Sequence, residues 1–495
     1  MNYQIVRNII GKIMILLAML MFLPLIVCII YQEEFINYVA FLVPILLLLV
    51  IGVLFNLKKA ENKKMMVREG FIIVGVSWLI MSLFGCIPFI ISGVLPNPFD
   101  AFFEITSGFT TTGATVMGGL QTITPEEALG MSHSIMFWRS FAHWIGGMGV
   151  LVFILMIIPE SDEGSAVHIL RAESPGPQVG RLVTKMKASS RILYLIYIVL
   201  TLVLILLLWI SPDMNLYESI IYALGTAGTG GFGIDNTCLE FYSAYSQYVI
   251  SVFMIIFGIN FTVYYFILVG NIKDVFKNDE LKWFLCIVVT SVILVFISIY
   301  PRIENFEETF RVSLFQVASF ISTTGYTTTS YVQWPALALL VLFILMFIGS
   351  CAGSTAGGIK CSRIVILAKS TLKKIKAMIN PRKVETIKMD GNTITEDTIS
   401  SVNSFLSVYL IVFILGAIVI AADPLEGITV IDCLTGSLSC ISNVGPGLGK
   451  ITSSTMGNFS NFTKFYLSLQ MIAGRLELFP LLMLFSPKTW AKKRM

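Results

Sequence analysis

Four short loops rich in glycine and threonine are the part of this sequence best suited to chemistry. They read Ser-Gly-Phe-Thr-Thr-Thr-Gly from residue 107, Gly-Thr-Ala-Gly-Thr-Gly-Gly-Phe from 225, Ile-Ser-Thr-Thr-Gly-Tyr from 321 and Ser-Asn-Val-Gly-Pro-Gly from 442. Aligned on one glycine each, the loops predict an ion-binding set made of Thr111, Thr112, Gly113, Gly228, Thr229, Gly230, Thr323, Thr324, Gly325, Asn443, Val444 and Gly445.

The chemistry that these loops suggest is the dehydration of a cation. An ion gives up its water only where backbone carbonyl oxygens replace the hydration shell, and a ring of four similar loops would supply them. Glycine tolerates backbone angles closed to other residues, so carbonyl groups can point inward. One such loop alone is more simply a tight turn or a close helix contact. Four loops in register, each after a short semi-apolar stretch, favour an ion filter.

The composition places these loops in a membrane. Of the 495 residues, 56% are hydrophobic and 13% are charged, against about 25% charged residues in a soluble domain. So few charged residues cannot cover a water-facing surface, which disfavours a soluble enzyme and a nucleic-acid binder. The net charge of +4 is also too small to indicate a polyanionic partner. Eight cysteines without a C-x-x-C pair, and three histidines, argue against a zinc or haem site.

The elements that must position the loops follow from the apolar runs. Ten runs are long enough to cross a bilayer, at approximately 13–31, 36–57, 71–94, 135–158, 191–211, 246–270, 283–300, 335–375 (interrupted), 402–422 and 461–487. Four stretches between them are too short to cross and are typical of re-entrant half-helices, near 99–110, 216–227, 309–322 and 431–442.

The sequence therefore predicts an all-α polytopic membrane protein with four pseudo-symmetric helix–pore helix–helix repeats around a central pore. Two N-terminal transmembrane helices and a linker would occupy 1–69, and the repeats 70–190, 191–281, 282–400 and 401–495. If the spans alternate, 27 of the 34 basic residues fall on one side and Arg302, Arg311 and Lys450 on the other, while the remaining four lie in or at the edge of spans. The basic side, with both termini, is then cytoplasmic.

With these loops and spans, the chain resembles the Trk/Ktr/HKT superfamily of potassium transporters. The two extra N-terminal spans and the segment Arg-Ala-Glu-Ser-Pro-Gly-Pro at 171–177 are similar to the TrkH branch. The resemblance implies K⁺ at the filter residues, and Gly113, where sodium-favouring members have serine, implies potassium permeation. It also implies a homodimer in the plasma membrane of a bacterial-type cell. TrkA-like cytoplasmic subunits would bind nucleotide (ATP, ADP or NAD), and no covalently bound cofactor is expected.

The filter loops depart from the four identical T-V-G-Y-G loops of potassium channels. Only Gly325 and Tyr326 match the Gly-Tyr pair of that motif. The fourth loop has Asn443, Val444 and Pro446 around its glycine. Unlike loops would form an uneven ring of carbonyl groups. We therefore expect weaker discrimination against other monovalent cations.

A run of ten small residues at 349–358 interrupts the second helix of the third repeat. Continuous helix is costly there, and non-helical backbone at membrane depth is tolerated only beside protein or a water-filled cavity. The run is either a close packing face or, as the resemblance implies, a flexible gate beneath the filter. The predicted gate residues are Gly349, Cys351, Gly353, Ser354, Thr355, Gly357, Gly358 and Lys360.

Arg475 lies inside an otherwise apolar span of the fourth repeat. A buried charge in a membrane usually faces a bundle interior or a wet cavity. We expect it to face the pore below Gly445 as a positive barrier to cations. The alternative is a local ion pair with Glu477, although residues i and i+2 do not face each other on a helix.

Several other ionisable residues have two interpretations. Acids in the external pore-helix region either concentrate cations at the entrance or are ordinary solvated or helix N-terminal acids, and these are Asp100, Glu104, Glu218 and Asp432. Arg139 and His143 mark a proton pathway or, more simply, anchor helices near the interface.

The leading hypothesis is a gated potassium pore driven by the membrane potential. The alternative within transport is a proton- or sodium-coupled potassium symporter, which needs a relay of acids or histidines at mid-membrane; the candidates are Glu477 and His143. A membrane-embedded enzyme would need clustered acids or histidines, which the external loops lack. We therefore expect no enzymatic activity.

Overall fold

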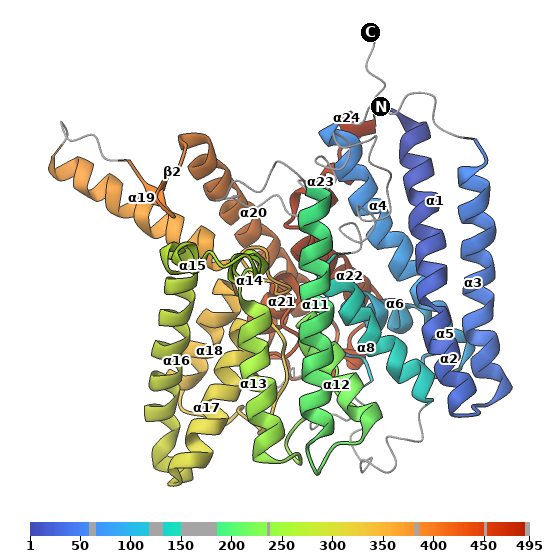
Figure 1. Cartoon of the computed structure of the whole chain (residues 1–495), viewed down its shortest axis with the longest axis horizontal. Helices are drawn as coiled ribbons and strands as arrows, with labels where there is room; N and C mark the ends of the chain where they lie inside the picture. The colour runs from blue at the N-terminus through green and yellow to red at the C-terminus, as the bar shows by residue number, and fades with distance from the viewer. Residues whose placement is uncertain are drawn as a thin grey trace.

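The computed structural model describes residues 1–58, 66–117, 132–149, 186–234, 238–380, 386–449 and 453–490. Within them the chain is almost entirely helical, as the sequence predicted. The one exception is a small antiparallel hairpin, in which β1 (Lys388–Met389) pairs with β2 (Asn392–Thr393). The N-terminus, the last described helix α24 (Pro487–Trp490) and the projecting helix α19 (Cys361–Ile379) lie toward the top of Figure 1.

Two N-terminal helices stand at one edge of the molecule, outside the repeats (Figure 1). The first is α1 (Tyr3–Leu20), continued by α2 (Phe22–Ile30), and the second is α3 (Phe35–Asn56). Gly11 and Gly52 lie at their contact, where a Cβ atom on either glycine would be 2.9 Å from the other's carbonyl oxygen. Small residues let two membrane helices approach this closely.

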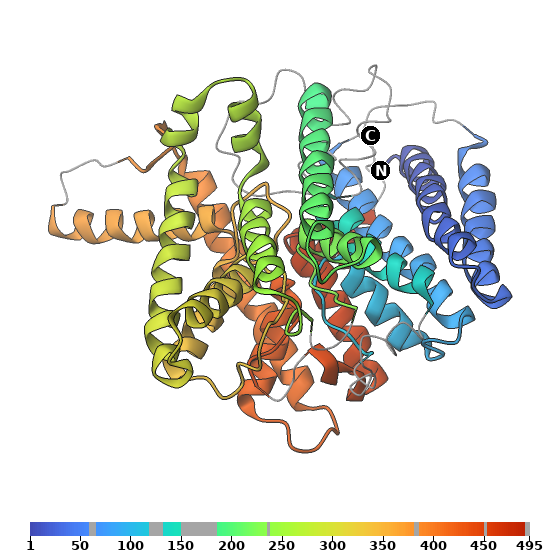
Figure 2. The ribbon, with the colours of Figure 1, turned by 60° about the horizontal axis from the view of Figure 1, so that its bottom comes forward.

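A unit of long helix, short helix and second helix then recurs four times. The first unit is α4 (Val67–Gly85), α6 (Pro98–Phe109) and α8 (His133–Gly147); the second is α11 (Met186–Trp209), α12 (Leu216–Gly228) and α13 (Ala244–Gly258); the third is α16 (Asp279–Ile303), α17 (Phe306–Ile321) and α18 (Ala336–Ile348); the fourth is α20 (Glu396–Ala421), α21 (Val430–Ser442) and α22 (Asn461–Arg475). Connecting helices are α5 (Ile87–Ile91), α14 (Phe261–Leu268), α15 (Ile272–Lys277), η3 (Ser453–Asn458), α23 (Phe479–Phe485) and α24 (Pro487–Trp490). In Figure 2 the blue segments lie to the right, the yellow ones to the left, and the green and red ones between them.

Each short helix, which we call a pore helix, begins at a side-chain cap. Asn97, Asn215, Asn305 and Thr429 each accept a hydrogen bond from a backbone N–H group of the first helical turn. These residues satisfy N–H groups that have no partner within the helix. The caps explain why apolar stretches of only 12 to 16 residues form defined helices within the fold.

The second helix of each repeat ends earlier than the sequence predicted. Six helical segments of the described chain are long and apolar enough to cross a membrane, or seven if the bent pair α13 and α14 is one span, rather than ten. The pair bends by 90°, α18 stops at the glycine-rich segment, and α22 stops at Arg475. The predicted span 135–158 ends in α8 at Gly147, and its part from 150 onward lies outside the described residues.

Candidate functional site

The four pore helices end in the same backbone turn. Each is followed by a residue with φ of 55°, and these residues are Thr111, Thr229, Thr323 and Asn443. Such left-handed backbone is uncommon outside glycine. Two residues further on, each loop has a glycine with positive φ: Gly113 (80°), Gly231 (80°), Gly325 (82°) and Gly445 (99°). The four loops are therefore copies of one local structure.

The positions of this turn shift the alignment of the second loop with the other three by one residue from the alignment expected from sequence. Gly230 was placed opposite Gly113 because each glycine follows a threonine. In the structure Thr229 itself is the left-handed residue, so Gly231 matches Gly113 and Gly230 matches Thr112. Gly231 is thus a site residue that the sequence alignment missed. The pair Gly230-Gly231 was the signal, because either glycine permits the turn.

The four glycines form a closed ring of contacts with their neighbours. Each lies so close to a carbonyl oxygen of the next loop that a Cβ atom would come within 3.0 Å of it. In chain order the pairs are Gly113 with Gly230, Gly231 with Thr324, Gly325 with Val444, and Gly445 with Thr112. The fourth loop therefore closes on the first, and the ring contains one carbonyl group and one glycine from every repeat.

Polar side chains at the ring are fully buried. The amide nitrogen of Asn443 donates to Thr112 Oγ1 and to the carbonyl oxygen of Met471, both at 2.9 Å, and so joins the fourth loop to the first. Two oxygens, Thr111 Oγ1 and Asn443 Oδ1, have no hydrogen-bond partner among the described residues. Buried polar atoms normally have a partner, so these two oxygens are unsatisfied within the part of the chain that the structure describes.

His143 explains why the second loop contains extra glycines. Its Nδ1 atom lies 2.7 Å from the carbonyl oxygen of Gly108 and its ring lies 4.2 Å from that of Phe232. A Cβ atom on Gly230 would overlap the imidazole ring, and one on Gly228 would overlap the backbone of His143. The histidine therefore packs against the second filter loop. A role as a helix anchor fits this position more simply than a proton pathway.

The predicted gate residues cross the region next to the filter as one irregular segment. Gly349, Gly353, Gly358 and Lys360 have positive φ, which ends α18 and delays the start of α19. The N–H group of Gly357 donates to Thr323 Oγ1 at 2.7 Å, directly at the left-handed residue of the third filter loop. The segment 349–360 is therefore in contact with the filter.

The same segment is fastened to the ends of neighbouring helices. Cys351 N–H donates to the carbonyl of Gly258 at 3.1 Å, and the carbonyl of Gly353 accepts from Phe261 N–H at 3.1 Å, which ties the segment to the bend between α13 and α14. Three further side-chain contacts are local or reach α13: Ser354 Oγ donates to Cys351 O, Thr355 Oγ1 to Phe257 O, and Lys360 Nζ to Ala356 O.

Glu280 near the start of α16 anchors this segment as well. Its Oε1 atom accepts from the N–H groups of Ala352 at 2.7 Å and Ser362 at 3.0 Å, at either end of the segment. Sequence reasoning missed Glu280, because an acid at the start of an apolar helix normally needs no partner beyond the helix itself.

Arg475 donates to backbone carbonyl groups of three described residues. Its guanidinium group donates to Thr355 in the predicted gate at 2.6 Å, and to Gly146 and Gly147 at the end of α8 at 2.5 and 2.6 Å. Glu477 forms its ion pair with Arg363 instead. Glu477 thus has a partner on α19, other than the local one that the sequence left open.

The external acids have partners in the fold. Asp100 pairs with Lys464 at 2.5 Å, and the fully buried Glu104 pairs with Arg139 at 2.6 Å. Glu218 and Asp432 each complete a capping box at the third position of a pore helix. These contacts support the structural interpretation of the four acids over cation attraction. The segment 171–177 lies outside the described residues.

Comparison with known proteins agrees with this architecture. The family described as TrkH, cation transport protein, matches residues 38–492. The chain is 32% identical to the Trk system potassium uptake protein TrkH of Salmonella typhimurium over 501 residues, covering 99% of this chain and 100% of that protein. The Escherichia coli K12 protein of the same name gives the same identity and coverage.

A solved structure has the same fold. The crystal structure of the potassium transporter TrkH from Vibrio parahaemolyticus superimposes with a TM-score of 0.85 at 28% sequence identity, covering 99% of this chain and 100% of that one. An uncharacterized cation transporter of Methanocaldococcus jannaschii is also 28% identical, over 97% of this chain and 95% of that protein. The similarity therefore includes the repeats and the N-terminal helices together.

Proposed function

The chain belongs to the TrkH family of cation transport proteins, and we propose that it takes up potassium across the plasma membrane through the ring formed by its four filter loops. One observation carries the proposal: the glycine of each loop lies against a carbonyl group of the next loop, and the fourth loop closes on the first. A dehydrated cation needs carbonyl oxygens on all sides, which a closed ring supplies. Four turns that served only to connect helices would not be expected to contact one another in a ring.

The chemistry of the ring suits a potassium ion. The carbonyl groups of four residues lie against the ring glycines: Thr112, Gly230, Thr324 and Val444. Carbonyl oxygens can replace the hydration shell of an ion. The C-terminal ends of the pore helices add partial negative charge at the same place.

The segment 349–360 would act as the gate and Arg475 as a positive barrier. Conduction then requires the segment to move away from the filter, which breaks the hydrogen bond from Gly357 to Thr323 and that from Arg475 to Thr355. Each neutral hydrogen bond is worth about 1 kcal/mol net, and one from a charged donor about 2 kcal/mol. The free energy needed to break these two hydrogen bonds is similar to the coupling free energy that a bound regulatory partner typically supplies.

The basic surface indicates the side of the membrane and the partners. Helix α19 carries Lys369, Lys373, Lys374 and Lys376 and lies on the same side of the molecule as the N-terminus and α24. By the positive-inside rule this side is cytoplasmic. The proposal includes a homodimer and a TrkA-like subunit that binds nucleotide on this side, with no cofactor bound covalently to the chain itself.

Growth of an uptake-deficient bacterium at low potassium tests the proposal. We expect the chain to restore growth, and to do so more strongly when a TrkA-like subunit is co-expressed. A chain present in the membrane that restores no growth under either condition would contradict potassium uptake. If uptake in vesicles depends on a proton or sodium gradient, the coupled symporter replaces the passive pore.

A further inference from the structure

A buried ion pair lies behind the filter in the first repeat. Arg139 on α8 and Glu104 on the pore helix α6 are 2.6 Å apart, and their side chains are 8% and 0% exposed. Taking two charges out of water is costly, and only close geometry with further hydrogen bonds compensates for it. Each partner of this pair has such additional contacts.

The two side chains reach different filter loops. Glu104 accepts hydrogen bonds from Thr115 Oγ1 and from the N–H group of Val116, both at 2.9 Å, in the stretch after Gly113. Arg139 donates to the carbonyl of Gly233 at 3.0 Å, in the stretch after Gly231. The pair therefore bridges the first and second loops just beyond the glycines of the ring.

A cation–π contact strengthens the bridge on the second loop. The guanidinium carbon of Arg139 lies 3.7 Å from the ring centre of Phe232, the residue directly after Gly231. Such contacts gain strength where water is excluded. The carbonyl of Gly230, which touches Gly113, belongs to the same loop junction. A displacement of Arg139 would thus move two consecutive residues next to the ring.

The other repeats have no equivalent charge. Glu104 stands nine residues before its filter glycine, and the corresponding residues are Tyr222, Gln316 and Gly436. Tyr222 donates to the carbonyl of Cys238, and the buried amide group of Gln316 has no hydrogen-bond partner among the described residues. The ionic bridge is therefore specific to the junction between the first and second repeats.

We propose that Glu104 and Arg139 are positioning residues that set the separation of the first and second filter loops and thereby the preference of the pore for potassium over sodium. This inference rests on the proposed function of the ring. A ring whose loops are free to move closer together accommodates the smaller sodium ion better, so loss of the bridge weakens selectivity. The pair acts through the loops and does not touch the ion.

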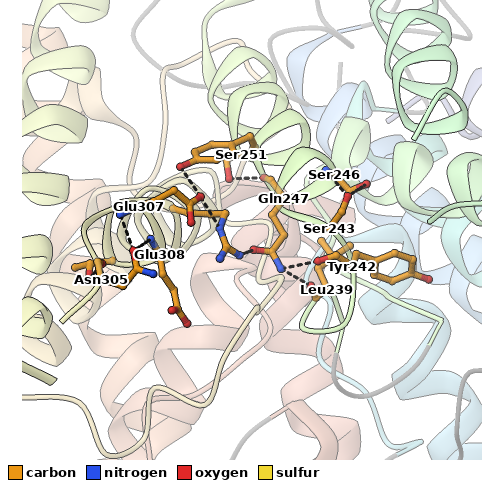
Figure 3. Close-up of polar contacts among 12 residues, drawn as sticks. Leu239, Tyr242, Ser243, Ser246, Gln247, Ser251, Asn305, Glu307 and Glu308 are labelled. Carbon is orange, nitrogen blue, oxygen red and sulfur yellow. Dashed lines mark hydrogen bonds and ion pairs between the residues drawn. The ribbon is translucent and has the colours of Figure 1, made fainter. Parts of the chain in front are cut away.

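The junction between the second and third repeats supplies a matched control. Figure 3 shows Gln247 on α13 donating to the carbonyls of Leu239 and Tyr242, beside Glu307 on the pore helix α17. Arg311 pairs with Glu307 at 3.0 Å, but the Glu307 side chain is 55% exposed. An exposed pair contributes little to stability or geometry, so Glu307→Gln changes the charge near a pore helix without loosening the ring.

The test is the sodium-to-potassium permeability ratio of the full chain in liposomes, measured from reversal potentials. The main variant combines Glu104→Gln with Arg139→Gln, which leaves no uncompensated buried charge, so the fold should be retained. Glutamine at 139 is too short to keep the contacts with Gly233 and Phe232. We expect the ratio to rise about tenfold, which corresponds to about 1.4 kcal/mol of lost discrimination. Glu307→Gln should match the wild type.

Arg139→Lys adds a second measurement, because it keeps the charge but loses the planar donor geometry. We expect its sodium-to-potassium permeability ratio to lie between those of the wild type and the double variant. If both variants insert normally, conduct, and keep the wild-type ratio, the positioning role is overturned. If the wild-type chain itself shows no preference for potassium, the proposed function fails rather than this inference. A ratio that rises equally in Glu307→Gln also overturns the inference.

Discussion

Replacing Gly113 with serine is the sharpest perturbation of the filter. Gly113 has φ of 80° and lies against the carbonyl oxygen of Gly230. A Cβ atom there would overlap this oxygen and lie 3.2 Å from its carbonyl carbon and 3.6 Å from the Cα of Gly231. All three atoms are backbone, so they can make room only if the second filter loop moves.

The magnitude has two parts. Positive φ costs a residue other than glycine about 1–2 kcal/mol, a loss of stability that any such site would show. Displacing the carbonyl of Gly230 adds a loss of ion discrimination, and each 1.4 kcal/mol of lost discrimination is about tenfold in relative affinity. We therefore expect Gly113→Ser to raise sodium permeability relative to potassium by about tenfold.

Gly427→Ser is the control for backbone strain alone. Gly427 has φ of 78°, and a Cβ atom on it would meet nothing within 4 Å. Both variants should lower thermal stability by a similar amount, but only Gly113→Ser should change selectivity in bi-ionic flux assays. Unchanged selectivity in a folded Gly113→Ser protein would refute the carbonyl ring, and so would an equal change in Gly427→Ser.

Three further substitutions test the neighbouring contacts. Arg475→Ala should raise potassium flux, because it removes the positive charge and the bond to the gate segment; lost flux in a folded protein would mean that Arg475 supports structure. Thr323→Val should raise basal flux several-fold, since it removes the acceptor for Gly357 worth about 1 kcal/mol, whereas Thr323→Ser should not. Gly230→Ala should impair flux by contact with His143, and adding His143→Ala should restore part of it; no recovery would contradict that contact.

Much of the architecture could be predicted because its causes are local. The pore helices begin at Asn or Thr caps and end in loops rich in glycine and threonine, and both signals are visible in the sequence. The apolar runs identified the long first helices for the same reason, since the length needed to cross a bilayer is fixed.

The features that sequence reasoning missed depend on contacts between distant segments. The second loop was aligned one residue early because Gly230 and Gly231 both permit the turn, and only the fold shows that His143 lies beside Gly230. Likewise the pairing of Glu477 with Arg363 joins residues 114 positions apart, and only the fold brings them together. Three of the second helices end at glycines, whereas α22 ends at Arg475, ahead of the left-handed Glu477 and Leu478. Whether membrane-embedded backbone can leave the helix at such points depends on what surrounds it.

The most direct test of the central claim is the reversal potential of the purified full-length chain in liposomes with potassium on one side and sodium on the other. If a passive ring of carbonyl groups conducts the ion, the potential should follow the potassium gradient and stay unchanged when a proton gradient is added. A potential near zero, or one that moves with the sodium or proton gradient, would contradict the account.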